Sequence, residues 1–188
     1  MRARSSDASL IARAQEGDVD AFAELVRAYE HRVRAVLYRL LDDERDVEEA
    51  TQDAFVQAWR NLGRFRGEAA VFTWLYRIAV NEAFARLRRK RVPAAALDAV
   101  ESAEHLGRAA DEPAASAEMG ELRAFLASRV RALPFEYRAP LVLRDLVGLS
   151  NQEVADVLDL SVAAAKSRIH RARLHIREEL ERWEEARW

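Results

Sequence analysis

The apolar residues of this chain recur at intervals of three and four positions, and no stretch shows sustained alternation of β-branched residues. Such spacing places apolar side chains on one face of an α-helix, whereas a half-buried strand requires alternation. The chain is also rich in Ala, Leu, Arg and Glu, which favour helices, and it holds only 6 Gly among 188 residues. The sequence therefore predicts an all-α fold.

The first half of the chain predicts amphipathic helices that pack on one another. Within residues 7–41 a short helix ends at Gly17, and a long helix follows with Asp18 or Asp20 as its N-cap. A second pattern of the same kind covers residues 44–62. The positions expected to face the core are Phe22, Leu25, Val26, Tyr29, Val33, Val36, Leu37 and Leu40 in the first pattern, and Val47, Ala50, Thr51, Ala54, Phe55, Ala58, Trp59 and Leu62 in the second.

The formal net charge of −2 hides long segments of opposite sign. Residues 42–53 carry seven acidic residues against Arg45, so the outer face of this predicted helix is acidic. Residues 60–91 carry nine basic residues against Glu68 and Glu82, a balance of +7. A basic segment of this strength indicates binding to a polyanion such as nucleic acid.

Pro93 ends the last predicted helix of this half, and the Ala-rich segment 93–121 follows with seven acidic residues against a single Arg. Its composition is typical of a flexible, solvated chain. We therefore expect two small helical domains, over residues 1–92 and 117–188, joined by a flexible acidic linker over residues 93–116.

The second domain ends in a helix-turn-helix pattern at residues 149–173. Ser150 and Glu153 form a capping-box signature that opens a first helix. A short turn follows at Asp159, and Ser161 is a suitable N-cap for a second helix. One side of that second helix is apolar and is expected to pack on the preceding helix; its members are Val162, Ala165, Ile169, Ala172 and Ile176.

The opposite side of this second helix is small, polar and basic, as in a helix that enters the major groove of DNA. Small residues allow close approach, and basic residues neutralise phosphates. An arginine such as Arg171 pairs well with guanine. The plainer alternative, a solvated basic surface helix, does not explain the paired caps and the short turn. The residues expected to contact DNA here are Lys166, Ser167, Arg168, His170, Arg171 and Arg173.

Aromatic and basic residues are interleaved in FRGEAAVFTWLYRIAVNEAFARLRRKR, residues 65–91. Aromatic rings stack on unpaired bases while guanidinium groups hold the backbone, so this pattern suits the capture of melted DNA. Gly67 would let a loop approach the strand closely. Phe72 lies on an apolar helical stripe and is expected in the core, whereas Trp74 lies off that stripe, and both DNA contact and packing are open to it.

Three stretches, in this order, resemble the extracytoplasmic-function sigma factors, a class of the bacterial sigma-70-type family. They are DVEEATQDAFVQAWRNLGRF at 46–65, FRGEAAVFTWLYRIAVNEAFARLRRKR at 65–91 and LVLRDLVGLSNQEVADVLDLSVAAAKSRIHRAR at 141–173. The resemblance covers nearly the whole chain. It implies promoter melting and polymerase binding for the first domain, and recognition of the upstream (−35) promoter element for the helix-turn-helix domain.

The resemblance also implies site residues. The acidic helix would dock core RNA polymerase through Asp46, Glu48, Glu49, Gln52, Asp53 and Phe55. A solvated acidic face explains the same charges equally well. The contacts to the downstream (−10) element that the resemblance and the aromatic and basic pattern together indicate are Arg64, Phe65, Arg66, Gly67, Trp74, Arg77, Asn81, Arg86, Arg88 and Arg89.

The chain departs from the family pattern at three places. Residues 163–165 are three alanines where the family often has Gly-Thr-Val, which implies a different upstream consensus. Pro140 lies inside an expected helix over 135–147 and should kink or restart it. His170 stands where relatives often carry an aromatic residue.

These features together point to an RNA polymerase sigma factor that directs promoter recognition and DNA melting and is not an enzyme. Its expected partners are bacterial core RNA polymerase, promoter DNA and an anti-sigma factor.

The chain has no Cys, which excludes disulfides, thiol nucleophiles and cysteine zinc sites, and we expect no cofactor and no metal ion. It shows no signal peptide and no apolar run long enough for membrane insertion, so we expect a cytoplasmic protein. The main alternative is a stand-alone helix-turn-helix transcriptional regulator, which usually needs a dimer to read two half-sites.

Overall fold

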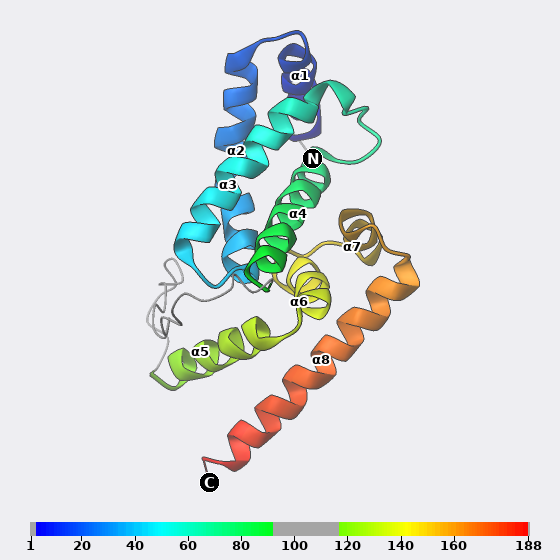
Figure 1. Cartoon of the computed structure of the whole chain (residues 1–188). Coiled ribbons are helices and arrows are strands. Elements are labelled where there is room, and N and C mark those ends of the chain that lie inside the picture. Colours follow the sequence, from blue (N-terminus) through cyan, green and yellow to red (C-terminus); the bar gives the residue numbers. More distant parts are fainter. Residues whose placement is uncertain (1–2, 92–116, 188) are drawn as a thin grey trace.

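The computed structural model describes residues 3–91 and 117–187, and within these ranges the chain forms helices and short connections (Figure 1). The prediction of an all-α fold is confirmed. The predicted acidic linker, residues 93–116, lies outside the described residues. None of the described helices is long and apolar enough to cross a membrane.

Four α-helices form the first domain, and a 3-10 turn follows the third: α1 (Ala3–Gln15), α2 (Val19–Leu40), α3 (Glu44–Asn61), the turn Leu62–Arg64, and α4 (Val71–Arg91). Gly17 has a φ of +98° and separates α1 from α2, because glycine adopts this conformation without steric cost. Asp18 is the N-cap of α2 and accepts a hydrogen bond from the Ala21 N–H at 3.0 Å. The predicted short and long helices of this region are therefore confirmed.

The predicted apolar faces of α2 and α3 are buried against each other and against α4. Thr51 is also buried, and its hydroxyl is satisfied within its own helix because it donates to the Val47 carbonyl at 2.7 Å. Three predicted core residues are less buried than expected: Phe22 and Val26 are partly buried, and Trp59 keeps 39% of its surface exposed. Its ring lies 4.9 Å from the ring of Phe22, so Trp59 covers the rim of the core rather than filling it.

The second domain contains α5 (Ala117–Ala132), α6 (Phe135–Leu141), a π-helical turn (Val142–Leu146), α7 (Asn151–Leu158) and α8 (Val162–Glu185). Pro140 lies inside α6, and the helix widens into the π turn directly after it. Proline removes one backbone donor and its ring crowds the carbonyl four residues earlier, that of Glu136, so its direct effect falls on the turn before Pro140 and not on the π turn after it. Helix α6 continues through Pro140 to Leu141, so it does not restart at the proline, and the change of helix type begins at Val142.

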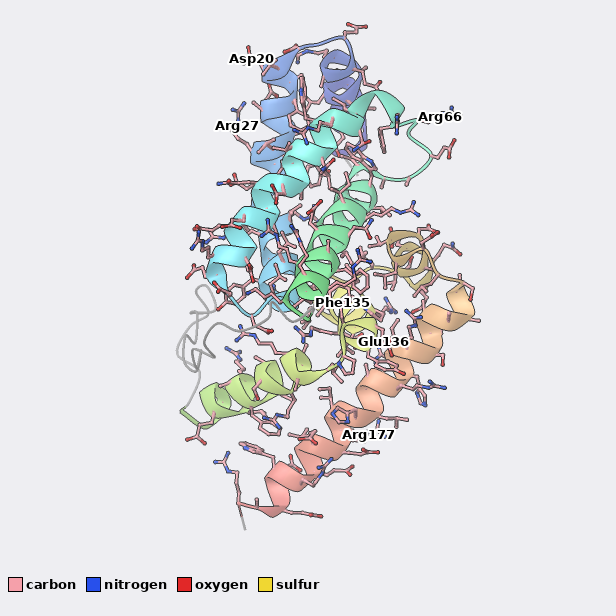
Figure 2. All side chains as sticks on the ribbon, viewed as in Figure 1. Asp20, Arg27, Arg66, Phe135, Glu136 and Arg177 are labelled. Atoms are coloured by element: carbon pink, nitrogen blue, oxygen red, sulfur yellow. The ribbon has the colours of Figure 1, made fainter. Side chains whose placement is uncertain are left out.

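The two domains pack against each other in this structure. Helix α7 lies against α4 (Figure 1), and one hydrophobic core runs through both domains. Arg138 of α6 is 7% exposed and donates to the Leu40 carbonyl at 3.0 Å, so a side chain of the second domain caps the C-terminal end of α2. Figure 2 shows Phe135 at the end of α4, where its ring lies 5.4 Å from that of Phe84.

Candidate nucleic-acid and polymerase surfaces

The helix-turn-helix is built as the sequence predicts. The Ser150 hydroxyl accepts from the Glu153 N–H at 3.2 Å, and the Glu153 carboxylate accepts from the Ser150 N–H at 2.8 Å, which completes the capping box. Asp159 closes α7 in the left-handed conformation, with a φ of 54°. The Ser161 hydroxyl then accepts from the Ala164 N–H at 3.1 Å and starts α8.

Helix α8 turns its apolar side inward and its polar side outward. Ala165, Ile169 and Ala172 are buried, while Val162 and Ile176 are partly buried, as predicted. The predicted DNA-contacting side chains lie on the other side, where Lys166, Ser167, His170, Arg171 and Arg173 are exposed and Arg168 is half-buried. One helix thus presents hydroxyl, imidazole and guanidinium groups together, which is the set needed to reach base edges and phosphates.

Arg173 differs from the other cations on this side of α8. Its Nε donates to Asp145 Oδ2 at 2.9 Å and its Nη2 to Asp145 Oδ1 at 2.5 Å. The hydrogen bonds that the guanidinium donates to Asp145 raise the pKa of Arg173. This bidentate pair ties α8 to the π turn, so Arg173 has a structural partner in addition to its predicted contact with phosphate.

The loop between α3 and α4 is anchored from α1. The Gln15 side-chain amide donates to the carbonyls of Leu62 and Phe65, both at 2.9 Å. The ring of Phe65 packs on Trp74 with centroids 4.9 Å apart. Arg66 projects from the outer edge of this loop (Figure 2). Arg64, Arg66 and Gly67 are exposed, so the predicted base-trapping loop does lie at the surface.

The outward side of α4 continues from this loop. Trp74, Arg77, Asn81 and Arg88 follow one another at intervals of three, four and seven residues, which places them on one helix face. Arg77, Asn81 and Arg88 are exposed, and Trp74 is half-buried, so its ring both packs on the loop and borders solvent. Arg89 is also exposed, and its Nε donates to its own helix at the Ala85 carbonyl (3.4 Å).

Arg77 also faces the second domain. Its Nη2 lies 3.3 Å from Asp159 Oδ1, at the turn of the helix-turn-helix. Both side chains are largely exposed, at 48% and 90%. Exposed pairs of this kind contribute little to stability, so the contact does not commit Arg77 to one partner.

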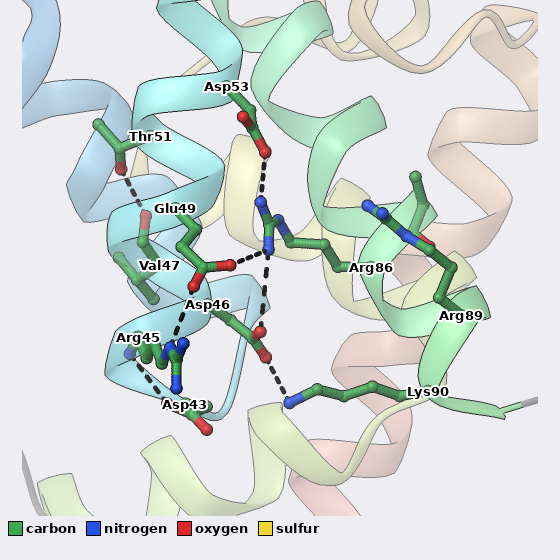
Figure 3. Close-up of polar contacts among 11 residues, drawn as sticks. Asp43, Arg45, Asp46, Val47, Glu49, Thr51, Asp53, Arg86, Arg89 and Lys90 are labelled. Carbon is green, nitrogen blue, oxygen red and sulfur yellow. Dashed lines mark hydrogen bonds and ion pairs between the residues drawn. The ribbon is translucent and has the colours of Figure 1, made fainter. Parts of the chain in front are cut away.

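Arg86 points in the opposite direction, toward the acidic residues of α3 (Figure 3). Its Nη1 donates to Glu49 Oε2 at 2.9 Å, and its Nη2 donates to Asp53. One turn further along α4, Lys90 Nζ lies 2.5 Å from Asp46 Oδ2. The Arg86 side chain is only 12% exposed, so the structure reassigns it from a contact with the DNA backbone to a contact with α3.

The side chains of this cluster shift one another's pKa. The hydrogen bond from Arg86, and then that from Arg45, lowers the pKa of the Glu49 carboxyl. Asp46 raises the pKa of the Lys90 ammonium through its hydrogen bond. Burial disfavours the Arg86 charge, but its bonds to Glu49 and Asp53 leave the pKa of that guanidinium raised. The contacts within the cluster therefore favour the charged forms of Glu49, Arg86 and Lys90.

The residues predicted to dock polymerase fall into three groups on α3. Glu48 and Gln52 are exposed on the outer side of the helix. Asp46, Glu49 and Asp53 form the cluster with α4. Phe55 is 8% exposed and belongs to the hydrophobic core, so its side chain does not reach the surface, which corrects its predicted docking role.

The sequence did not indicate the roles of Gln15 and Asp145, nor the contact of the turn residue Asp159 with Arg77. Each acts through a partner far away in the chain, and a lone Gln or Asp carries no local signal of such a contact. For Arg86 and Lys90 the sequence does hold a local signal of their inward position. They continue the spacing of buried Ala79 and Ala83 along α4, so helical periodicity alone places them on the inner side.

Comparisons with known proteins agree with this arrangement. Sigma-70 region 2 matches residues 25–92, and Sigma-70, region 4 matches residues 126–176. The RNA polymerase sigma-H factor of Pseudomonas aeruginosa is 35% identical over 179 residues, which cover 92% of this chain and 93% of that protein. The ECF RNA polymerase sigma-E factor of Escherichia coli (strain K12) is 37% identical over 179 residues, with the same coverage of both chains.

Two solved structures share the fold. The structure of CnrH in complex with the cytosolic domain of CnrY matches with a TM-score of 0.69 and 30% identity, over 94% of this chain and 97% of that chain. The sigma factor RpoE of Bartonella quintana, in complex with the anti-sigma factor NepR, matches with a TM-score of 0.66 and 21% identity, over 85% of this chain and 96% of that chain.

Proposed function

This chain belongs to the extracytoplasmic-function sigma factors of the sigma-70 family, and we propose that it divides promoter recognition between α8 and the surface formed by α4 and its preceding loop. As a sigma factor it directs sequence-specific promoter recognition and DNA melting at the start of transcription. The observation that carries the division of labour is the presence of two outward-facing polar surfaces on different helices, one of which also presents aromatic rings.

Helix α8 is proposed to read the upstream element in duplex form. Its N-terminal half is capped, positioned by α7 and lined by exposed hydroxyl, imidazole and guanidinium groups. A helix in the major groove contacts bases through such residues and phosphates through its flanking cations. Ser167, His170 and Arg171 are assigned to base edges, and Lys166, Arg168 and Arg173 to the backbone.

The surface of α4 and its loop is proposed to hold the melted downstream element. Phe65 and Trp74 offer flat apolar faces to an extruded base, and Asn81 offers an amide that can pair with a base edge. The loop residues Arg64, Arg66 and Gly67, together with Arg77, Arg88 and Arg89, are assigned to the strand backbone. Since Arg77 is paired with Asp159 only at the surface, contact with a phosphate requires the loss of a weak ion pair.

Helix α3 is proposed to bind core RNA polymerase through the carboxylates and amide of Asp46, Glu48, Glu49, Gln52 and Asp53. Polymerase would then perform the covalent chemistry, and this chain would act as a specificity factor without enzymatic activity of its own. Because promoter DNA and polymerase occupy the bacterial cytoplasm, we place the protein there. An anti-sigma factor is the proposed regulatory partner, as in the relative solved with NepR.

Run-off transcription tests this proposal. The purified chain is added to bacterial core polymerase on templates that carry a promoter with both elements, with only the upstream element, or with neither. Transcription that depends on both elements and on this chain is the expected result. The proposal fails if the chain binds one duplex site tightly as a dimer without polymerase and enables no transcript, which is the behaviour of a stand-alone regulator.

A further inference from the structure

The inner side of α4 carries small residues that let the helix pack closely on α3, followed by the cation Arg86. Ala79 and Ala83 are fully buried, and Arg86 and Lys90 continue the same side of the helix toward its C-terminal end. Alanines permit close approach of two helices. The longer Arg86 and Lys90 side chains then extend from α4 toward the carboxylates of α3 (Figure 3).

The guanidinium of Arg86 joins two carboxylates that are one helical turn apart. Nη1 donates to Glu49 and Nη2 to Asp53, and Nη1 also lies 4.0 Å from Asp46 Oδ1. The rigid, planar fork of arginine fixes the orientation of both acids, which a single ammonium could not do. The second oxygen of Glu49 accepts from Arg45 Nε at 3.1 Å.

The cation is covered while the anions remain accessible. The Arg86 side chain is 12% exposed, whereas those of Glu49 and Asp53 are 48% and 53% exposed. A carboxylate on a helix surface otherwise samples several rotamers, and a partner that binds it must bear the cost of ordering it. In this chain Arg86 already holds the carboxylates of Glu49 and Asp53 before a partner binds them.

We propose that Arg86 is a positioning residue of the polymerase-docking surface, which holds Glu49 and Asp53 in the orientation in which they meet cationic groups of core polymerase. The inference rests on the proposed role of α3. It also explains why a cation in the basic segment of α4 is turned away from the side that faces DNA. An arginine that is nearly covered and shared between two carboxylates is poorly placed to bind a phosphate.

The affinity of the full-length chain for core polymerase tests this role. We expect Arg86→Gln to weaken binding about tenfold, and Arg86→Lys to weaken it less, because lysine keeps the charge but loses the fork. Arg27→Gln is the matched control, since it removes one charge from an exposed position on α2 and should leave the affinity unchanged. Binding of the single-stranded downstream element should be the same for Arg86→Gln as for the unmodified chain.

A double-mutant cycle separates positioning from other effects. The variant Glu49→Gln/Asp53→Asn should bind polymerase more weakly, and adding Arg86→Gln to it should cause no further loss. The inference is overturned if the full loss from Arg86→Gln persists in that background, if the two acids prove dispensable for polymerase binding, or if Arg86→Gln impairs only DNA binding.

Folding is followed in parallel through the thermal unfolding midpoint. If Arg86→Gln does not fold at the assay temperature, Arg86→Lys takes its place: weaker polymerase binding at an unchanged midpoint supports the inference, and unchanged binding overturns it. Failure of the unmodified chain to bind polymerase at all would instead contradict the proposed function, so the two failures are distinguishable.

Discussion

Helix α4 and the N-terminal half of α8 are both strongly basic, yet they use their cations in opposite ways. On α8, Lys166 and Arg171 are exposed and form no ion pair within the described residues. On α4, Arg86 and Lys90 turn inward to the carboxylates of α3. The buried side of α8 packs on neutral residues of α6 and α7, whereas that of α4 meets an acidic helix. A run of basic residues therefore gives the total charge of a helix but not the charge that DNA can reach.

The largest effect is expected on the outward side of α8. Arg171→Ala should cost about 1–3 kcal/mol of binding free energy at the base pair that Arg171 reads, because a bidentate arginine contact is lost. The measurement is the affinity of the polymerase complex for upstream elements substituted at each position. Selectivity should relax at one position only.

Lys166→Ala is the matched comparison for Arg171→Ala. A phosphate contact is indifferent to sequence, so this variant should weaken all the templates alike and reduce the dependence on salt. If Arg171→Ala behaves in the same uniform way, Arg171 does not read a base, and the outward side of α8 serves only as a source of charge.

The outward side of α4 should give a smaller effect. Trp74→Ala should slow promoter opening by raising its activation free energy by about 1 kcal/mol. This value is at the low end of the range for a base stacked on an aromatic ring, because Trp74 also packs on Phe65. The rate of open-complex formation is measured on a duplex template, and polymerase affinity is measured separately. Trp74→Phe keeps a flat ring and should restore most of the rate.

Normal opening by Trp74→Ala on duplex templates would assign Trp74 to packing alone. A template with a preformed bubble sharpens the result, since capture of unpaired bases contributes there while duplex separation does not. A defect on the duplex that disappears on the bubble would move the role of Trp74 from holding bases to separating them.

Periodicity and capping predicted most of the fold from the sequence. Gly17, Ser150 and Ser161 act within a few residues of themselves, so their effects on helix ends follow from local rules and were found where expected. Trp59 shows the limit of the same rule. Its position matches the apolar stripe of α3, but its ring packs on the partly buried Phe22 and keeps 39% of its surface exposed, so it lies at the rim.

The site was less predictable because its side chains are set by neighbours distant in the chain. Arg86 and Arg88 are two residues apart in one basic cluster; helical periodicity places them on different sides of α4, but only the position of α3 shows that the first is covered and paired with carboxylates. Likewise, the anchoring of the loop by Gln15 spans 47 and 50 residues. Contacts of this range depend on tertiary packing, which a charge count does not contain.

A substitution at Gln15 disturbs the loop that precedes α4 without changing any residue on the outward side of α4. Gln15→Leu removes both hydrogen bonds to the loop backbone, each worth about 1 kcal/mol, and should slow promoter opening about fivefold. Binding of the isolated upstream element should not change, because α8 is far from α1 in the fold. Equal opening rates for Gln15→Leu and the unmodified chain would show that the loop holds its shape without this anchor.

The smallest effect concerns Arg173, the exposed cation of α8 that is paired with Asp145. Arg173 is already paired with Asp145, and both are partly exposed, so Arg173→Ala should change stability by about 0–1 kcal/mol. If the pair persists on DNA, this variant should leave the salt dependence of upstream binding unchanged, while Asp145→Ala should steepen the dependence by about one phosphate contact, because Arg173 is released. A shallower salt dependence for Arg173→Ala would show that Arg173 exchanges Asp145 for a phosphate, which is the backbone role proposed for it; the covered Arg86 has no such freedom.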